Sequence, residues 1–142
     1  MKETITLART EQEILACYPV MAELRPHIPQ DDFVQVVTRL QRDAGFQMAC
    51  LTDGDIKAVA GFRISEWLGG GRYLEIEDLA TKSDARSKGY GGTLLDWLVE
   101  HARKHECHHL KLVSNTSRLD AHRFYLRKGM SLDAYYFSVK IP

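Results

Sequence analysis

The sequence predicts an α/β (α+β) domain built on a mixed, twisted central sheet with helices on both faces. Short runs with apolar residues at alternating positions, typical of strands, flank longer runs with apolar residues three and four apart, typical of helices. The expected order is β-α-α-β-β-β-α-β-α-β, in which the hairpins imply antiparallel pairing and the strand–helix–strand connections some parallel pairing. At 142 residues the chain has the length of one domain, expected over residues 1–142.

The N-terminal part predicts a strand followed by two helices. Ile5 and Leu7 alternate with threonines, which is typical of a short strand. Thr10 stands before two glutamates and marks a helix start, and Pro19 should kink or divide the helix that follows. After a proline-containing loop, apolar residues at helical spacing predict a second helix that ends near Gly45.

The rest of the chain predicts three strands joined by glycine turns, then alternating helices and strands. The three strands are expected at 46–52, 56–66 and 72–81. The later elements are expected as a helix at 90–106, a strand at 110–112, a helix at 117–129 and a strand at 132–141. The second of these helices carries a Ser-x-x-Asp capping-box pattern that starts at Ser117.

Charge and composition exclude several classes of protein. Lys plus Arg and Asp plus Glu both number 19, and the absence of a basic excess argues against a nucleic-acid partner. No apolar run approaches the roughly 20 residues of a membrane helix, and the first ten residues lack the apolar core of a signal peptide. The three widely spaced cysteines do not form a disulfide framework. We therefore expect a cytoplasmic protein with free thiols and no membrane partner.

A glycine cluster between a predicted strand and a predicted helix indicates an anion site. The cluster reads Arg86-Ser87-Lys88-Gly89-Tyr90-Gly91-Gly92. Glycine lets another group approach the backbone closely, and the free N–H groups of a helix start attract a phosphate or pyrophosphate. Arg86 and Lys88 add positive charge. The alternative is a turn that merely lets helix and strand pack closely.

An irregularity is also expected in the strand at 72–81. Leu74 and Ile76 lie on one face, and the next apolar residue, Leu79, comes three positions later instead of two. This break in the period indicates a β-bulge near Glu77-Asp78, which would leave backbone groups unpaired. The alternative is that Asp78 begins a loop.

Two motifs resemble those of the GNAT superfamily of N-acetyltransferases. The residues from Arg86 to Gly91 match the family's cofactor loop, Arg/Gln-x-x-Gly-x-Gly/Ala, and those from Ala121 to Met130 match Ala-x-x-Phe/Leu-Tyr-x-x-x-Gly-Phe/Met. The order of elements is similar as well, so the resemblance covers nearly the whole chain. It implies a GNAT fold and an acetyl-CoA-dependent N-acetyltransferase that transfers the acetyl group directly to a primary amine. The alternative is a non-catalytic acyl-CoA-binding sensor or regulatory module.

The resemblance implies where acetyl-CoA would bind. The pyrophosphate would lie across the backbone N–H groups of the glycine-rich loop, and the pantetheine arm would run beside the end of the preceding strand. Many members carry an Asn three residues before the motif Ala; this chain has Arg118 there and Asn115 three residues earlier. The expected cofactor-binding residues are Leu79, Ala80, Thr81, Arg86, Ser87, Lys88, Gly89, Tyr90, Gly91, Gly92, Asn115 and Arg118.

Three residues are candidates for the chemistry. A base must take the proton of the amine, and Glu75 and Glu77 share one strand face, where the resembling family often uses a Glu. Glu77 is ahead of Glu75 because it lies nearer the expected bulge; the alternative is a solvated acidic face. By its motif position Tyr125 is implied to assist the departing thiolate. The alternative for Tyr125 is packing beside Ala121, one helical turn away.

No metal is expected, and the partners are defined only by class. His101 and His105 lie one helical turn apart, as a shared zinc would require, but no further ligand is evident. The expected acceptor is a small-molecule or peptide amine. After Gly129 the chain has room for one strand where many members of the family finish with two, so a homodimer is expected.

Overall fold

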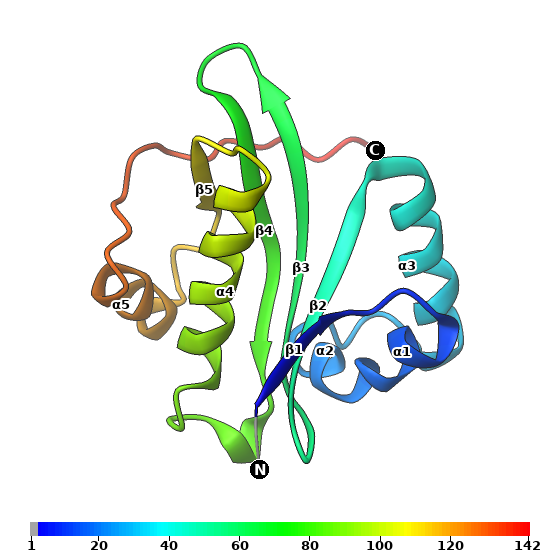
Figure 1. The fold of residues 1–142 in the computed structure, drawn as a ribbon. Coiled ribbons are helices and arrows are strands. Elements are labelled where there is room, and N and C mark those ends of the chain that lie inside the picture. Colours follow the sequence, from blue (N-terminus) through cyan, green and yellow to red (C-terminus); the bar gives the residue numbers. More distant parts are fainter. Residues whose placement is uncertain (1–2) are drawn as a thin grey trace. The chain divides into compact units, whose positions relative to one another are not determined.

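The computed structural model describes residues 3–142, which fall into two units (Figure 1). The N-terminal unit extends to Lys111, and the C-terminal unit comprises Leu112–Pro142. Each unit is described by itself, because their positions relative to one another are not determined. That the whole chain forms one domain stays a prediction.

The N-terminal unit is a sheet in the order β1-β2-β3-β4-β5 with helices beside it. The strands are β1 (Thr4–Leu7), β2 (Phe46–Asp53), β3 (Asp55–Trp67), β4 (Gly71–Thr81) and β5 (His109–Leu112), which ends at the boundary between the units. The helices are α1 (Glu11–Ala16), α2 (Tyr18–Leu24), α3 (Gln30–Ala44), the short 3-10 helix η1 (Ser83–Ala85) and α4 (Tyr90–Lys104). The first four strands pair antiparallel, while α4 connects β4 to β5, which run in the same direction (Figure 1).

The sequence signals that start and stop the first helices have clear structural counterparts. The Thr10 hydroxyl accepts a hydrogen bond from the Glu13 N–H at 3.1 Å, and the Glu13 carboxylate accepts one from the Thr10 N–H at 2.9 Å. Pro19 lies in the first turn of α2, where its missing N–H has no cost, and so divides the expected helix in two. Gly45 ends α3 with a left-handed φ of 69°.

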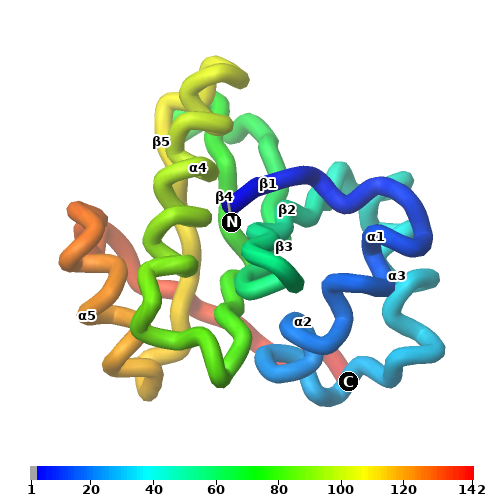
Figure 2. Tube along the Cα trace, turned by 60° about the horizontal axis from the view of Figure 1, so that its bottom comes forward, coloured from blue at the N-terminus to red at the C-terminus, as the bar shows by residue number. Residues whose placement is uncertain are grey.

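Helices cover both faces of the sheet, as expected. Figure 2 shows α4 on one side of the strands and α1 to α3 on the other. On the α4 side, Leu94 and Leu98 are fully buried against the strands. On the other side, a second apolar cluster joins Phe33 of α3 to Met48 of β2 and Val59 of β3. The predicted fold class is confirmed.

The C-terminal unit contains one helix, α5 (Leu119–Arg127). The capping box expected at Ser117 does not form, because the Ser117 hydroxyl donates to the Asn115 side chain at 2.8 Å and α5 starts without a side-chain cap. The helix ends in a Schellman arrangement, in which the Met130 N–H donates to the Tyr125 carbonyl at 3.1 Å and Gly129 has a φ of 90°.

The strand expected at 132–141 is absent, which corrects the last element of the predicted order. Residues 130–142 form neither helix nor strand. The apolar side chains are spaced for a strand, but a strand forms only where a neighbour satisfies its N–H and C=O groups. Phe137 is 88% exposed, so its apolar surface is not covered either.

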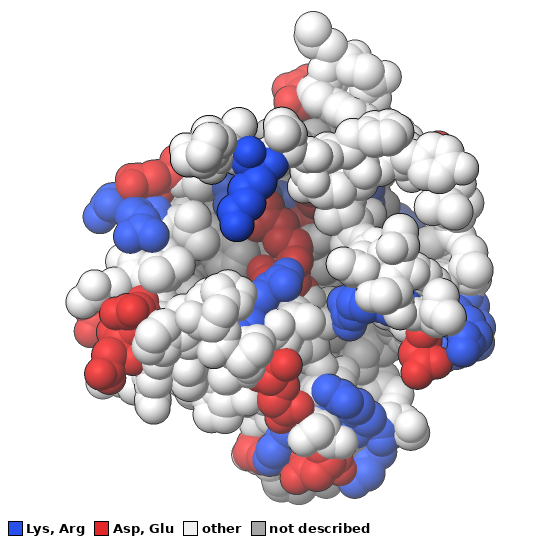
Figure 3. Space-filling view, turned by 180° about the vertical axis from the view of Figure 1, so that it is seen from behind, with Lys and Arg blue, Asp and Glu red and all other residues white. Residues whose placement is uncertain are grey.

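The thiols and charges agree with the sequence reading. Cys17 and Cys50 are buried free thiols, and Cys107 is a partly buried one. On the face shown in Figure 3, acidic and basic side chains are interspersed. Within residues 3–142, no helix is long and apolar enough to cross a membrane.

Candidate active site

A β-bulge interrupts β4 at the expected place. In the pairing of β3 with β4, Gly61 lies opposite Asp78 and Phe62 lies opposite Ile76, which leaves Glu77 without a partner. Because β4 continues to Thr81, Asp78 does not begin a loop. The bulge predicted from the broken apolar period is therefore confirmed.

Two carboxylates and two guanidinium groups meet at this bulge. The Arg63 Nε lies 2.9 Å from the Glu77 carboxylate. The Arg25 Nε donates to the Asp78 carboxylate at 2.8 Å, and the Arg25 Nη2 donates to the Glu77 carbonyl at 2.9 Å. Arg25 thus fastens the loop after α2 to both bulge residues. The Asp78 side chain is only 14% exposed, so its pairing with Arg25 compensates for its burial.

Gly61 provides the space that this arrangement needs. A Cβ at Gly61 would lie 2.5 Å from the Asp78 carboxylate and 2.5 Å from the Phe46 ring, far inside van der Waals contact. The sequence reading did not single out Gly61, Arg63 or Asp78 as site residues. The available signal was an isolated glycine inside an apolar strand, which is typical of a bulge or of a close approach to the backbone.

Beyond the bulge, one edge of β4 has no strand partner in the part of the chain that the structure describes. The four-residue strand β5 begins beside the start of β4, where the His108 N–H donates to the Arg72 carbonyl at 2.7 Å. Since the two strands run in the same direction and rise about 3.3 Å per residue, the part of β5 that belongs to the N-terminal unit, His109–Lys111, is too short to reach Leu79. Within the N-terminal unit, Leu79–Thr81 therefore pairs with a strand only on the β3 side, and the Thr81 carbonyl accepts a hydrogen bond from the Arg86 Nε at 3.4 Å. Glu75 lies opposite Arg63, upstream of the bulge.

The glycine-rich loop leads from η1 into α4 with two left-handed residues. Ser87 has a φ of 68° and Gly89 a φ of 85°. Gly89 is the N-cap of α4, and no side chain caps the helix. The N–H groups in the first turn of α4, at Tyr90, Gly91 and Gly92, therefore have no intrahelical acceptor, and the positive end of the helix dipole lies beside them. This local geometry suits a phosphate or pyrophosphate.

The side chains of the glycine-rich loop differ in whether they are free to contact a ligand. The Tyr90 ring is buried, and its hydroxyl donates to the Asp53 carboxylate at 2.7 Å, which raises the pKa of the phenol. Only the backbone of Tyr90 is thus free to contact a ligand. The Arg86 Nη2 lies 3.6 Å from the Glu23 carboxylate, and Lys88 is exposed.

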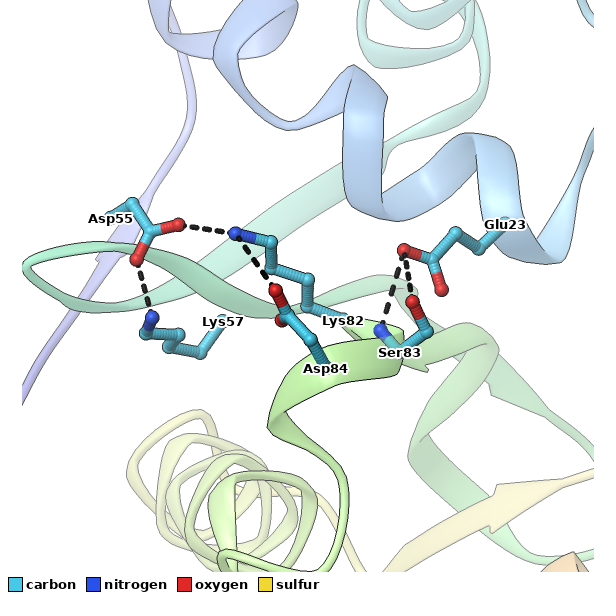
Figure 4. A network of polar contacts seen from close by, with 6 residues as sticks. All are labelled: Glu23, Asp55, Lys57, Lys82, Ser83 and Asp84. Atoms are coloured by element: carbon cyan, nitrogen blue, oxygen red, sulfur yellow. Dashed lines mark hydrogen bonds and ion pairs between the residues drawn. The ribbon is translucent and has the colours of Figure 1, made fainter.

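A polar network holds the segment before the loop in place. It comprises Glu23, Asp55, Lys57, Lys82, Ser83 and Asp84 (Figure 4). The Lys82 Nζ donates to the Asp55 carboxylate at 2.6 Å, and Lys57 pairs with the other oxygen of that carboxylate. These two lysines hold the pKa of Asp55 well below its usual range. On the other side, the Ser83 N–H donates to the Glu23 carboxylate at 3.3 Å, so η1 is tied both to the β2–β3 hairpin and to α2.

The remaining candidates belong to the C-terminal unit. Tyr125 is half-buried in α5, where burial raises the pKa of its phenol and the nearby Arg118 lowers it in part. The Asn115 side chain accepts hydrogen bonds from the Ser117 N–H at 3.0 Å and from the Ser117 hydroxyl at 2.8 Å. Arg118 is the N-cap residue of α5. The assignment of Tyr125, Asn115 and Arg118 to the site stays a prediction.

The histidine pair at the C-terminal end of α4 packs with aromatic rings. His101 stacks on Trp97 with ring centroids 4.7 Å apart and lies 4.2 Å from the His105 ring. Burial lowers the pKa of His101. Among residues 3–142 the structure contains no group of three or more His, Cys, Asp or Glu side chains placed to hold a metal ion.

Similarity to known proteins identifies the family. The model of the acetyltransferase (GNAT) family matches residues 7–130. The chain belongs to this family. It is 34% identical over 130 residues to the uncharacterized N-acetyltransferase YhdJ of Bacillus subtilis, covering 90% of this chain and 92% of that protein. It is also 35% identical over 74 residues to an aminoalkylphosphonate N-acetyltransferase of Salmonella typhimurium, covering 52% of this chain and 45% of that one.

Solved structures show the same fold. One of them is the aminoglycoside N-acetyltransferase AAC(6')-Iy in complex with CoA, which superposes with a TM-score of 0.81 at 12% identity. The match covers 99% of this GNAT chain and 97% of the other. At this level of identity the similarity establishes the fold and leaves the substrate open.

Proposed function

We propose that this GNAT chain is an acetyl-CoA-dependent N-acetyltransferase that transfers the acetyl group directly to a primary amine. The observation that carries the proposal is the bulge at Glu77, which lies on the same strand as Leu79–Thr81, a segment paired only on its β3 side within the N-terminal unit, and is followed by the uncapped start of α4. A strand edge and an anion site, one after the other along the chain, fit an amide-bearing arm that ends in a pyrophosphate. The CoA in the solved relative supports the same assignment.

Acetyl-CoA would be held mainly by backbone groups. The first-turn N–H groups of α4, from Tyr90 to Gly92, bind the pyrophosphate, and Ser87 and Gly89 supply the left-handed backbone that leaves those groups accessible. The outer edge of Leu79–Thr81 pairs with the pantetheine amides in the manner of an added strand. Lys88 and Arg86 add positive charge, although Glu23 already engages Arg86.

The acetyl group arrives as a thioester whose carbonyl carbon the amine attacks. Glu77, or Glu75 as the second candidate, takes the amine proton directly or through water as the C–N bond forms. Backbone N–H groups near the bulge stabilise the developing oxyanion. Tyr125 donates a hydrogen bond to the thiolate as the C–S bond breaks. No acyl-enzyme is proposed, because Cys17 and Cys50 are buried, which keeps both thiols away from the thioester of acetyl-CoA.

The decisive experiment follows thiol release from acetyl-CoA across a panel of amines, with the product mass confirmed. Glu77→Gln should lower kcat by about a hundredfold or more, the usual effect of removing a general base. Glu66→Gln is the matched control, because Glu66 is an exposed carboxylate on the neighbouring strand β3. Acetyl-CoA binding without release of thiol to any amine would contradict the proposal and indicate a sensor module instead.

Five further features complete the proposal. The acceptor is a small-molecule or peptide amine, the enzyme acts in the cytoplasm, and the catalytic chain needs no metal. A single domain is supported by the family match over residues 7–130, which includes parts of both units. A homodimer is supported by the exposed apolar side chains after Gly129.

A further inference from the structure

We infer that the acceptor is a small primary amine with one compact apolar group, such as an aralkylamine or a branched alkylamine. It would bind in a cavity of the N-terminal unit that the bulge residues line. This inference rests on the proposed acetyl transfer and narrows its acceptor to a chemical class.

The cavity has an apolar wall and a small volume. It measures about 250 Å³ and lies between α2, α3, β2 and the bulge of β4. Its apolar wall includes Ile28, Phe33, Val36, Leu40, Phe46 and Met48. Pockets for drug-sized ligands usually occupy roughly 300–1,000 Å³, so this one suits a smaller molecule.

The polar side chains of the lining are confined to three residues. These are Arg25, Glu77 and Asp78, and every other lining side chain is apolar. An amine placed here donates its N–H groups to the two carboxylates while its carbon chain contacts the apolar wall. The nitrogen then lies beside Glu77, the residue proposed to take its proton.

The charges of the lining argue against acceptors with additional charged groups. The Arg25 guanidinium already binds the Asp78 carboxylate at 2.8 Å and the Glu77 carbonyl at 2.9 Å. No uncommitted cation of the described residues therefore lines the cavity to receive a phosphonate or carboxylate. The remaining lining side chains are apolar, so a second ammonium group would find no partner among them.

The first test compares acceptors of similar size. Phenethylamine and 3-methylbutylamine should show kcat/KM at least tenfold above ethanolamine, 1,4-diaminobutane and 2-aminoethylphosphonate. An apolar contact of one or two methylene groups is worth roughly tenfold or more in such a pocket. A higher kcat/KM for any of the three polar amines would overturn the inference.

The second test changes the wall of the cavity. Val36→Asp places a charge on the apolar wall and should lower kcat/KM for phenethylamine at least tenfold, with the affinity for acetyl-CoA unchanged. Gln35→Asp adds the same charge at the neighbouring exposed position of α3 and should have no such effect. Val36→Phe, which fills space without a charge, should reject phenethylamine more strongly than ethylamine. Equal effects of Val36→Asp and Gln35→Asp would exclude the cavity as the acceptor site.

The outcomes separate this inference from the proposed function. If no amine releases thiol although calorimetry detects acetyl-CoA binding, the proposed transfer itself fails. If transfer occurs, but with polar amines or peptides preferred and with Val36 variants without effect, the function stands and the acceptor class is wrong. Chemical-shift changes on titration with phenethylamine provide a readout that does not depend on turnover, and they should disappear in Val36→Asp.

Discussion

The two units of the chain differ in how completely they cover their apolar side chains. In the N-terminal unit, Phe62, Leu94 and Leu98 are fully buried, and the sheet carries an apolar layer on each face. In the C-terminal unit, α5 has no buried residue, and the large apolar side chains between Leu132 and Ile141 are 72–88% exposed. A densely packed unit can hold catalytic groups in fixed positions. An uncovered apolar face of this size is typical of a surface that binds another molecule.

The candidate site follows the same division. The bulge carboxylates and the start of α4 are fixed by pairings inside the N-terminal unit, such as that of Arg25 with Asp78 at 2.8 Å. Tyr125 belongs to the other unit. The N-terminal unit therefore either carries the chemistry alone or needs a group from the C-terminal unit.

The largest expected effect is the loss of kcat on substitution of Tyr125, and it distinguishes these two possibilities. Tyr125→Phe should lower kcat about a hundredfold while the affinity for acetyl-CoA changes less than threefold, which is the pattern of an interaction made in the transition state. The phenyl ring keeps the contact with Phe124, whose centroid lies 5.5 Å away, so the fold should survive. Full activity of the Phe variant, with chemistry shown to limit turnover, would assign the whole reaction to the N-terminal unit.

The pH profile sharpens the same test. Burial raises the pKa of Tyr125 above its usual value near 10, so the phenol stays protonated and able to donate at neutral and mildly alkaline pH. The midpoint of a loss of kcat caused by its ionisation should therefore lie at a higher pH than for an ordinary tyrosine. This alkaline loss should be missing in Tyr125→Phe.

A substitution of Gly61 tests how rigidly the N-terminal unit holds the bulge. Gly61→Ala places a methyl group 2.5 Å from the Asp78 carboxylate and from the Phe46 ring, and neither can yield easily because Arg25 holds the first and burial holds the second. We expect a loss of about 1–3 kcal/mol in the free energy of unfolding, measured in urea. Gly69→Ala is the control, since Gly69 has open space around it. Equal stability of the two variants would show that the bulge tolerates displacement.

The glycine-rich loop should give a smaller effect. Gly91→Val obstructs the approach of a pyrophosphate to the start of α4 and should weaken CoA binding at least tenfold, or about 1.4 kcal/mol, by calorimetry on the folded variant. Gly69→Val in the β3–β4 turn serves as the control. Unchanged affinity in Gly91→Val would remove the loop from the cofactor site.

The same division explains what the sequence could predict. The bulge was predictable because Leu74 and Ile76 are two positions apart, whereas Leu79 follows three positions later. The structure buries Leu74 and Ile76, as that spacing requires. The partners of Asp78 were not, since Arg25 is 53 residues away along the chain and only the fold brings them together. The strand at 132–141 was predicted from its richness in aromatic residues, which favours a strand but does not supply the neighbouring strand that it needs.

A substitution of Phe137 should have the smallest effect on folding. It also tests directly whether the exposed apolar side chains of the C-terminal unit bind another molecule. Phe137, Val139 and Ile141 alternate with Ser138 and Lys140, as in a strand with one apolar face, and a second copy of the chain could cover that face. We expect light scattering to detect a dimer at tens of micromolar. Phe137→Ser should shift it to monomer while changing the free energy of unfolding of the dilute protein by no more than about 0.5 kcal/mol, because the ring is 88% exposed. Lys140→Ser, on the opposite side of the alternation, should leave the dimer intact. A wild-type monomer at these concentrations would count against self-association, and the exposed face would then need another partner.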